Sequence, residues 1–132
     1  MATATAPTAP TSTELTIAEA AEAAGLTAHT VRYYERAGLL PRVERNDSGH
    51  RRFNEEDVEW LVTFTRFRAT GMPIRRIREY VELVREGEHT EGERLALLEE
   101  HRADVRKRLA EVRRNLELID YKIKLYRERA CA

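Results

Sequence analysis

The sequence predicts a mainly α-helical fold, in which a small helical domain with one short hairpin is followed by a linker and a long paired helix. Glycines and capping residues divide the first 87 residues into short segments. A turn-forming cluster at 46–49 separates two of these segments. Beyond residue 90, apolar residues recur at alternating steps of three and four, which is the pattern of a coiled coil.

The charge of the chain is balanced overall but unevenly distributed. It has 23 basic and 23 acidic residues, yet residues 27–53 hold six arginines against three acids. Residues 60–76 hold four arginines and no acid, whereas 77–100 hold three arginines against eight acids. A basic region segregated from an acidic one is expected where a protein meets a polyanion.

Cysteine content and hydropathy indicate the compartment. The single cysteine, Cys131, excludes an internal disulfide framework and favours a reducing cytoplasm. No apolar run approaches the roughly 20 residues of a membrane span, and the start of the chain has no signal-peptide pattern. Residues 1–13, rich in Ala, Thr and Pro, are expected to be a disordered tail. We therefore expect a soluble cytoplasmic protein without a membrane association.

Two helices joined by a glycine turn are predicted first. A capping box that begins at Thr16 opens a helix over about 16–24, which Gly25 ends. Thr27 caps a second helix over about 27–37. Helix, tight turn and helix is the geometry of a helix-turn-helix, whose second helix enters the DNA major groove.

A hairpin and two more helices follow. The cluster 46–49 allows a small β-hairpin from which Val43 and Phe53 reach the core. Asn54 begins a third helix that runs to Gly71, and a fourth runs over 73–87. A basic hairpin beside a recognition helix is a wing, so the first domain is expected to be a winged helix-turn-helix.

The last helix has a seven-residue apolar repeat. It begins with a capping box at Thr90 and Glu93, and nothing breaks it before Tyr126. The seam residues are Leu98, Val105, Leu109, Val112, Leu116, Ile119, Ile123 and Tyr126, and the register also takes in Leu95, with Arg102 as an interruption. A lone helix would leave this seam in water, so a second copy of the chain is the simplest partner.

Donor-bearing side chains gather on the second helix and the hairpin. His29, Thr30, Arg32, Tyr33 and Arg36 can present hydrogen-bond donors and planar groups to DNA. The hairpin adds Arg42, Arg45, His50, Arg51 and Arg52, which can grip the flanking backbone. The alternative is a solvated charged face with tyrosines that only pack, and the pattern alone leaves both open.

The run LTIAEAAEAAGLTAHTVRYYERAGLLPRVERNDSGHRRFNEEDVEWL resembles the DNA-binding domain of the MerR family of bacterial transcription regulators. The matching pieces are TVRYYERAGLL at 30–40, GHRRF at 49–53 and EEDVEWL at 55–61. The segment at 70–81 is similar to the family's next helix pair, and the long helix to its dimerisation helix. The similarity covers about residues 14–126.

The resemblance implies a homodimer whose long helices pair antiparallel on a pseudo-palindromic promoter. Such regulators distort the DNA when an effector binds, so that RNA polymerase meets both promoter elements in register. The DNA contacts that it implies are Thr16, Arg32, Tyr33, Tyr34, Arg36, Arg51, Arg52 and Arg75. His29 and Thr30, nearest the start of the second helix, are our choice of base-reading residues.

The effector is not indicated by the sequence. One cysteine excludes an iron–sulfur cluster within one subunit, and we expect neither a metal nor a cofactor. Trp60, Phe64 and Phe67 could line a pocket for an apolar inducer, although core packing is the simpler interpretation. Cys131 is interpreted as a harmless thiol near the end of the chain, the alternative being a sensor.

The expected organisation is therefore a tail at 1–13, a winged domain at 14–71, a linker at 72–89, a dimerisation helix at 90–127 and a tail at 128–132. We expect a DNA-binding regulator and no enzyme, because no nucleophile–base pair or metal set is discernible. Two other functions stay open. One is an architectural winged-helix DNA-binding protein, and the other is a coiled-coil adaptor that binds another protein.

Overall fold

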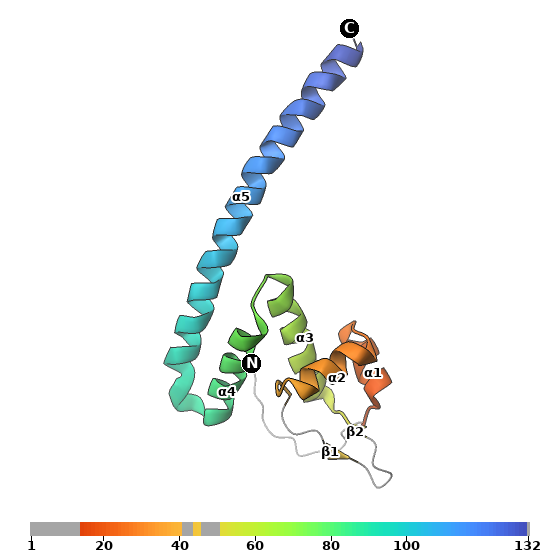
Figure 1. The fold of residues 1–132 in the computed structure, drawn as a ribbon, viewed down its shortest axis with the longest axis vertical. Helices are drawn as coiled ribbons and strands as arrows, with labels where there is room; N and C mark the ends of the chain where they lie inside the picture. The colour runs from red at the N-terminus through yellow and green to blue at the C-terminus, as the bar shows by residue number, and fades with distance from the viewer. Residues whose placement is uncertain (1–13, 41–43, 46–50, 132) are drawn as a thin grey trace. The chain divides into compact units, whose positions relative to one another are not determined.

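The computed structural model describes residues 14–40, 44–45 and 51–131 (Figure 1). The chain divides between Glu82 and Leu83 into two compact units, which we call unit 1 and unit 2. The elements in chain order are α1 (Ile17–Ala24), α2 (Ala28–Arg36), β1 (Glu44–Arg45), β2 (Arg51–Arg52), α3 (Glu55–Ala69), α4 (Ile74–Glu86), the 3-10 turn η1 (Glu88–Thr90) and α5 (Glu91–Cys131).

α1 and α2 form the predicted helix-turn-helix. The capping box at Thr16 is confirmed, because the Glu19 N–H donates to Thr16 Oγ1 at 3.1 Å and the Thr16 N–H donates to Glu19 Oε1 at 2.9 Å. Gly25 ends α1 with φ 75°, a left-handed conformation that glycine adopts without strain. α1 packs against both α2 and α3, so that a compact helical core forms.

The hairpin is present, and a residue from before α1 extends it. β1 and β2 are antiparallel, with Glu44 opposite Arg52. Leu15 then pairs with Phe53, the N–H of each donating to the carbonyl of the other at 2.8 and 2.9 Å. Phe53 is buried in the core as predicted, whereas Val43 lies outside the described residues. The sequence did not indicate the pairing through Leu15.

α3 begins with a second capping box. The Asn54 side chain accepts from the Asp57 N–H, and the Asn54 N–H donates to the Asp57 carboxylate, both at 2.9 Å. Asn54 was the predicted start, and Asp57 is buried because it completes this cap. α3 and α4 follow one another through a turn at Gly71, where φ is 90°.

The hydrophobic core of unit 1 draws on every helix of that unit. α1 contributes the fully buried Ala20, and the larger buried side chains come from α2, the loop after α2, the residue after β2, α3, the turn after α3 and α4. They include Val31, Leu39, Phe53, Leu61, Phe64, Met72 and Ile77. This core holds α2 in place, and α2 is the helix on which the proposed contacts depend.

Unit 2 begins with the end of α4 and a tight turn. Thr90 was expected to cap the last helix; it lies in η1, and α5 begins directly after it at Glu91. Thr90 is buried, and its hydroxyl lies 2.6 Å from the Leu83 carbonyl and 2.8 Å from the Gly87 carbonyl. The same oxygen accepts from Arg94 Nε at 3.0 Å. Its hydrogen bonds therefore fasten the turn between α4 and α5.

α5 is a single unbroken helix of 41 residues (Figure 1). It continues to Cys131, past the predicted end at 127. Over the part of the chain that the structure describes, no helix has the length and apolarity needed to cross a bilayer.

Candidate nucleic-acid interface

The start of α2 is ordered by a threonine pair. Thr27 Oγ1 accepts from the Thr30 N–H at 3.1 Å, and the Thr27 hydroxyl donates to Thr30 Oγ1 at the same distance. Thr30 is half-buried, so its side chain belongs to the cap as well as to the surface. Its own hydroxyl proton remains able to donate to an outside acceptor.

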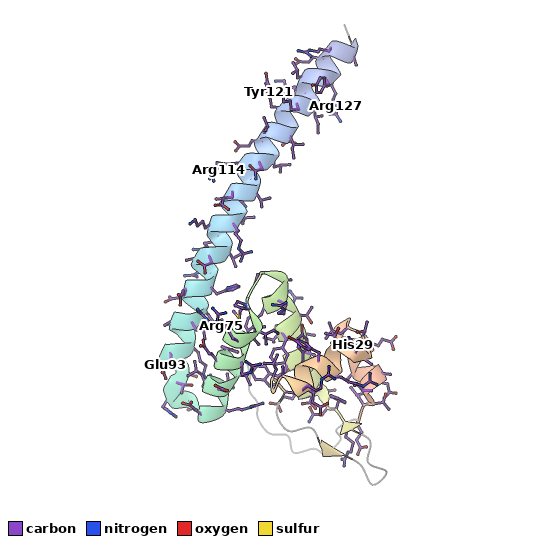
Figure 2. All side chains as sticks on the ribbon, viewed as in Figure 1. His29, Arg75, Glu93, Arg114, Tyr121 and Arg127 are labelled. Carbon is purple, nitrogen blue, oxygen red and sulfur yellow. The ribbon has the colours of Figure 1, made fainter. Side chains whose placement is uncertain are left out.

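Four of the expected contact residues of α2 form one outer face. His29, Arg32, Tyr33 and Arg36 are all exposed, Tyr33 to 43%. Their spacing of three, one and three residues puts them on one side of the helix, and Figure 2 labels His29 near the start of this side. An imidazole, a phenol and two guanidinium groups therefore point away from the core, whereas Val31 points into it.

Tyr34 is placed differently from the other expected contacts. It is only 5% exposed, and its ring meets Phe64 edge-on with centroids 5.5 Å apart. Burial raises the pKa of the Tyr34 phenol; the charge of Arg68 opposes this shift and Tyr33 adds to it. Tyr34 is thus a core residue that anchors α2, and the placement does not favour a direct DNA contact.

On the wing, the structure describes one of the three expected arginine side chains. Arg52 Nη2 lies 2.7 Å from Glu14 Oε2, and Arg52 Nε is buried without a hydrogen-bond partner among the described residues. Arg42 lies outside the described residues, and the Arg51 backbone lies in β2. The Arg52 guanidinium is therefore already paired with an acid of its own chain.

Thr16 and Arg75 mark the starts of two helices. Thr16 is the exposed N-cap of α1, and Arg75 is exposed in the first turn of α4 (Figure 2). Helix N-termini carry unpaired N–H groups and partial positive charge, which favour phosphate. Both residues are therefore chemically able to meet a DNA backbone.

The aromatic side chains of α3 pack against α4. The centroid of the Trp60 ring lies 5.6 Å from that of Phe64 and 6.2 Å from that of Tyr80, and the centroids of Phe67 and Tyr80 are 5.4 Å apart. Phe64 is fully buried. Of the three residues considered for an effector pocket, Trp60 and Phe64 contact each other, and Trp60 and Phe67 both contact Tyr80. Tyr80, which we did not single out from the sequence, completes the cluster, and its signal was its position on the apolar side of α4.

α5 exposes the predicted seam along its length. Leu98 and Val105 are half-buried, and the exposed seam residues are Leu95, Leu109, Val112, Leu116, Ile119, Ile123 and Tyr126. Leu118 and Tyr121 are also exposed and, by their positions in the seven-residue repeat, lie off this line; Figure 2 labels Tyr121 on α5. A single chain therefore leaves a continuous apolar stripe uncovered.

Metal-binding side chains are dispersed. Within residues 14–40, 44–45 and 51–131, no three His, Cys, Asp or Glu residues come together as a metal site would require. Cys131 is exposed at the end of α5.

Comparison with known proteins gives the family. The model of the MerR HTH family regulatory protein matches residues 15–83, and the model described as MerR, DNA binding, matches 58–120. An uncharacterised HTH-type transcriptional regulator of Haemophilus influenzae is 39% identical over 113 residues, which cover 86% of this chain and 84% of that protein.

Two crystal structures share the fold. HiNmlR, a MerR family regulator that lacks the sensor domain and is bound to promoter DNA, is 38% identical with a TM-score of 0.79. The alignment covers 88% of this chain and 92% of HiNmlR. A regulator from Listeria monocytogenes, described as a putative MerR family member, is 41% identical with a TM-score of 0.81 and 85% coverage of both chains. The resemblance seen in the sequence is confirmed: this chain belongs to the MerR family of DNA-binding, helix-turn-helix transcriptional regulators.

Proposed function

We propose that this regulator binds double-stranded promoter DNA as a homodimer, with α2 of each copy in a major groove and each wing on the flanking backbone. The observation that carries the proposal is the outer face of α2, where His29, Arg32, Tyr33 and Arg36 are exposed together. These groups match the donors that proteins use on base edges and phosphates.

Within this face we assign different roles by position. His29 lies in the first turn of α2 and is exposed, so we propose it as a base-reading residue, with Thr30 beside it. Arg32, Tyr33 and Arg36 follow along the helix and can reach either bases or phosphates.

The backbone contacts are proposed to come from helix starts and from the wing. Thr16 and Arg75 would place N-terminal N–H groups and a cation near phosphates. Arg42, Arg51 and Arg52 would hold the backbone beside the groove. Arg52 can do so once a phosphate replaces Glu14, because a half-exposed ion pair stabilises the chain by only about 1 kcal/mol or less.

The exposed seam of α5 supports a second copy as the partner. Seven apolar residues follow one another at steps of three and four, and their exposure to water is unfavourable. A matching helix would bury them by knobs-into-holes packing. We propose that the pair is antiparallel. In one antiparallel register every apolar seam residue except Ile119 meets another, and the facing pairs are Leu95 with Tyr126, Leu98 with Ile123, Val105 with Leu116 and Leu109 with Val112.

Charge also favours the antiparallel pair. In that register residues 90–102, with four glutamates and two arginines, face residues 119–131, with four basic and two acidic residues. A parallel pair would place each segment beside its own kind and bring like charges together. Arg102 faces Ile119 in this register, so the polar interruption of the seam does not meet its own copy.

The finer mechanism is proposed by analogy with the family. HiNmlR was crystallised on promoter DNA, and we extend promoter binding to this chain. We further propose that the dimer distorts a pseudo-palindromic promoter in response to a small effector, which brings RNA polymerase into register with both promoter elements.

Selection of duplexes tests this function. Random double-stranded DNA is enriched on the purified full chain, and the recovered duplex is titrated at several salt concentrations. We expect a two-fold symmetric sequence, two chains per duplex and an affinity that falls log-linearly with salt. Enrichment without any common sequence would favour an architectural protein, and no enrichment at all would favour the adaptor.

Cysteine cross-linking tests the register. In a Cys131→Ser background, Leu98→Cys and Ile123→Cys chains are oxidised separately and as a mixture. The antiparallel pair predicts a cross-linked dimer only in the mixture, because residue 98 faces residue 123 of the other copy. Efficient cross-linking of either variant with itself would show a parallel pair.

A further inference from the structure

α4 is tied directly to the end of the recognition helix. Arg78 Nε, on α4, donates a hydrogen bond of 3.1 Å to the carbonyl of Ala37, the C-cap residue of α2. The two residues are 41 positions apart in the sequence, and Arg78 is half-buried. A guanidinium at this position meets the negative end of the helix dipole and satisfies a carbonyl that has no partner within the helix.

A chain of aromatic contacts connects the same two helices. Tyr80, two residues after Arg78, lies against Trp60, Trp60 lies against Phe64, and Phe64 lies against Tyr34 of α2. Tyr34 is next to Tyr33, which belongs to the exposed face, and their ring centroids are 5.7 Å apart. Both a polar and an apolar connection therefore run from α4 to α2.

α4 is also the helix that passes from one unit to the other. It is continuous from Ile74 to Glu86, and the division between the units falls within it, after Glu82. A rotation of α4 about its axis displaces Arg78 and Tyr80 together. α2 then loses the hydrogen bond at its C-terminal end or moves with it.

We propose that Arg78 is a positioning residue for DNA recognition, which sets the orientation of α2 by holding its C-terminal end to α4. This inference rests on the proposed function of α2 as the recognition helix. Arg78 acts through the Ala37 carbonyl and contacts no phosphate. The preference for the correct DNA sequence, rather than the attraction to DNA in general, then depends on this hydrogen bond.

The test compares affinities for two duplexes, the one selected by the wild-type chain and a scrambled duplex of the same composition. Arg78→Met removes the donor and keeps an apolar stem. We expect the ratio of the two affinities to fall on the order of tenfold, as for the loss of one charge-assisted hydrogen bond. Affinity for the scrambled duplex and the salt slope should stay unchanged. Active fractions from stoichiometric titration correct for any unfolded chain.

Two further variants control the measurement. Arg78→Lys keeps a cation and a donor near the Ala37 carbonyl, so it should restore part of the ratio. Arg76→Met removes a neighbouring arginine that lies 3.4 Å from Glu79 of the same helix, and it should leave the ratio unchanged.

Three results would overturn the inference. An Arg78→Met chain that keeps the wild-type ratio would show that the hydrogen bond does not orient α2. Equal losses on both duplexes, with a salt slope lowered by about one, would make Arg78 a phosphate contact. A wild-type chain that does not distinguish the duplexes would refute the proposed function itself, and the role of Arg78 with it.

Discussion

Glu14 and Arg52 form an ion pair of 2.7 Å between the residue before the Leu15 bridge and the second strand of the wing. The pair is intramolecular, and it occupies a guanidinium that the family resemblance implies for DNA. Because both side chains are partly exposed, water and salt weaken the pair. The carboxylate therefore competes with phosphate for the same donor, and Glu14 should lower the affinity of the wing for DNA.

Removal of this competitor should strengthen DNA binding. Glu14→Gln keeps the size of the side chain and removes its charge, so we expect the affinity for the selected duplex to rise about threefold at low salt. Glu22→Gln, which removes an exposed acid of α1, is the matched control. Fluorescence anisotropy with labelled duplex measures both. A weaker Glu14→Gln complex, or equal gains in both variants, would contradict the competition.

Phe64 should be a principal source of stability in unit 1. It is fully buried and contacts the rings of Tyr34 and Trp60. Phe64→Ala should lower the free energy of unfolding by about 3–5 kcal/mol. The measurement is urea unfolding followed by the fluorescence of Trp60, the chain's one tryptophan. Phe67→Ala, at a half-buried position, should cost clearly less, and equal costs would argue against the packing described.

Tyr34 should make unit 1 sensitive to alkaline pH. Burial holds the folded-state pKa of the phenol above its ordinary value of about 10, so the folded chain keeps a proton that the unfolded chain releases. The contribution of this phenol to the free energy of unfolding is then constant below about pH 10 and is lost as the pH rises above it. Tyr34→Phe should remove part of this fall, measured as the difference in unfolding free energy between pH 8 and 10.5. An identical pH dependence in both chains would refute it.

The seam of α5 offers a matched pair of substitutions. Leu116 lies on the seam and Leu118 lies off it, and both are exposed in the single chain, to 50% and 60%. Leu116→Asp should give monomers in sedimentation velocity, because it buries a charge in the paired helices. Leu118→Asp should leave the dimer intact. Dimers of both variants, or monomers of both, would refute the seam.

The helix boundaries of unit 1 could be predicted because their signals are local. Thr16, Thr27 and Asn54 cap the helices that they were expected to begin, and each bonds to a residue three positions later. Such contacts can be predicted because both partners are close together in the sequence. The same local pattern predicted that the Thr90 side chain would cap the last helix, but its hydroxyl donates to the Leu83 carbonyl of α4 instead.

The contacts that could not be predicted join distant parts of the sequence. The Leu15–Phe53 bridge and the Arg78–Ala37 hydrogen bond depend on how the elements pack. Tyr34 has the same side chain as its neighbour Tyr33, yet only one of them is buried, because the helical period turns them to different sides. The seam of α5 was readable because a repeat is visible in the sequence itself, whereas its partner remains a proposal.

The mass of the protein–DNA complex tests the central claim most directly. Sedimentation equilibrium, followed through dye-labelled DNA, is measured on the selected duplex and on a duplex with one half-site scrambled. Two copies joined by α5 predict two chains on the full duplex and much weaker binding to the half-site duplex. One chain per duplex, with equal affinity for both, would contradict the claim that paired α5 helices place two recognition helices on one promoter.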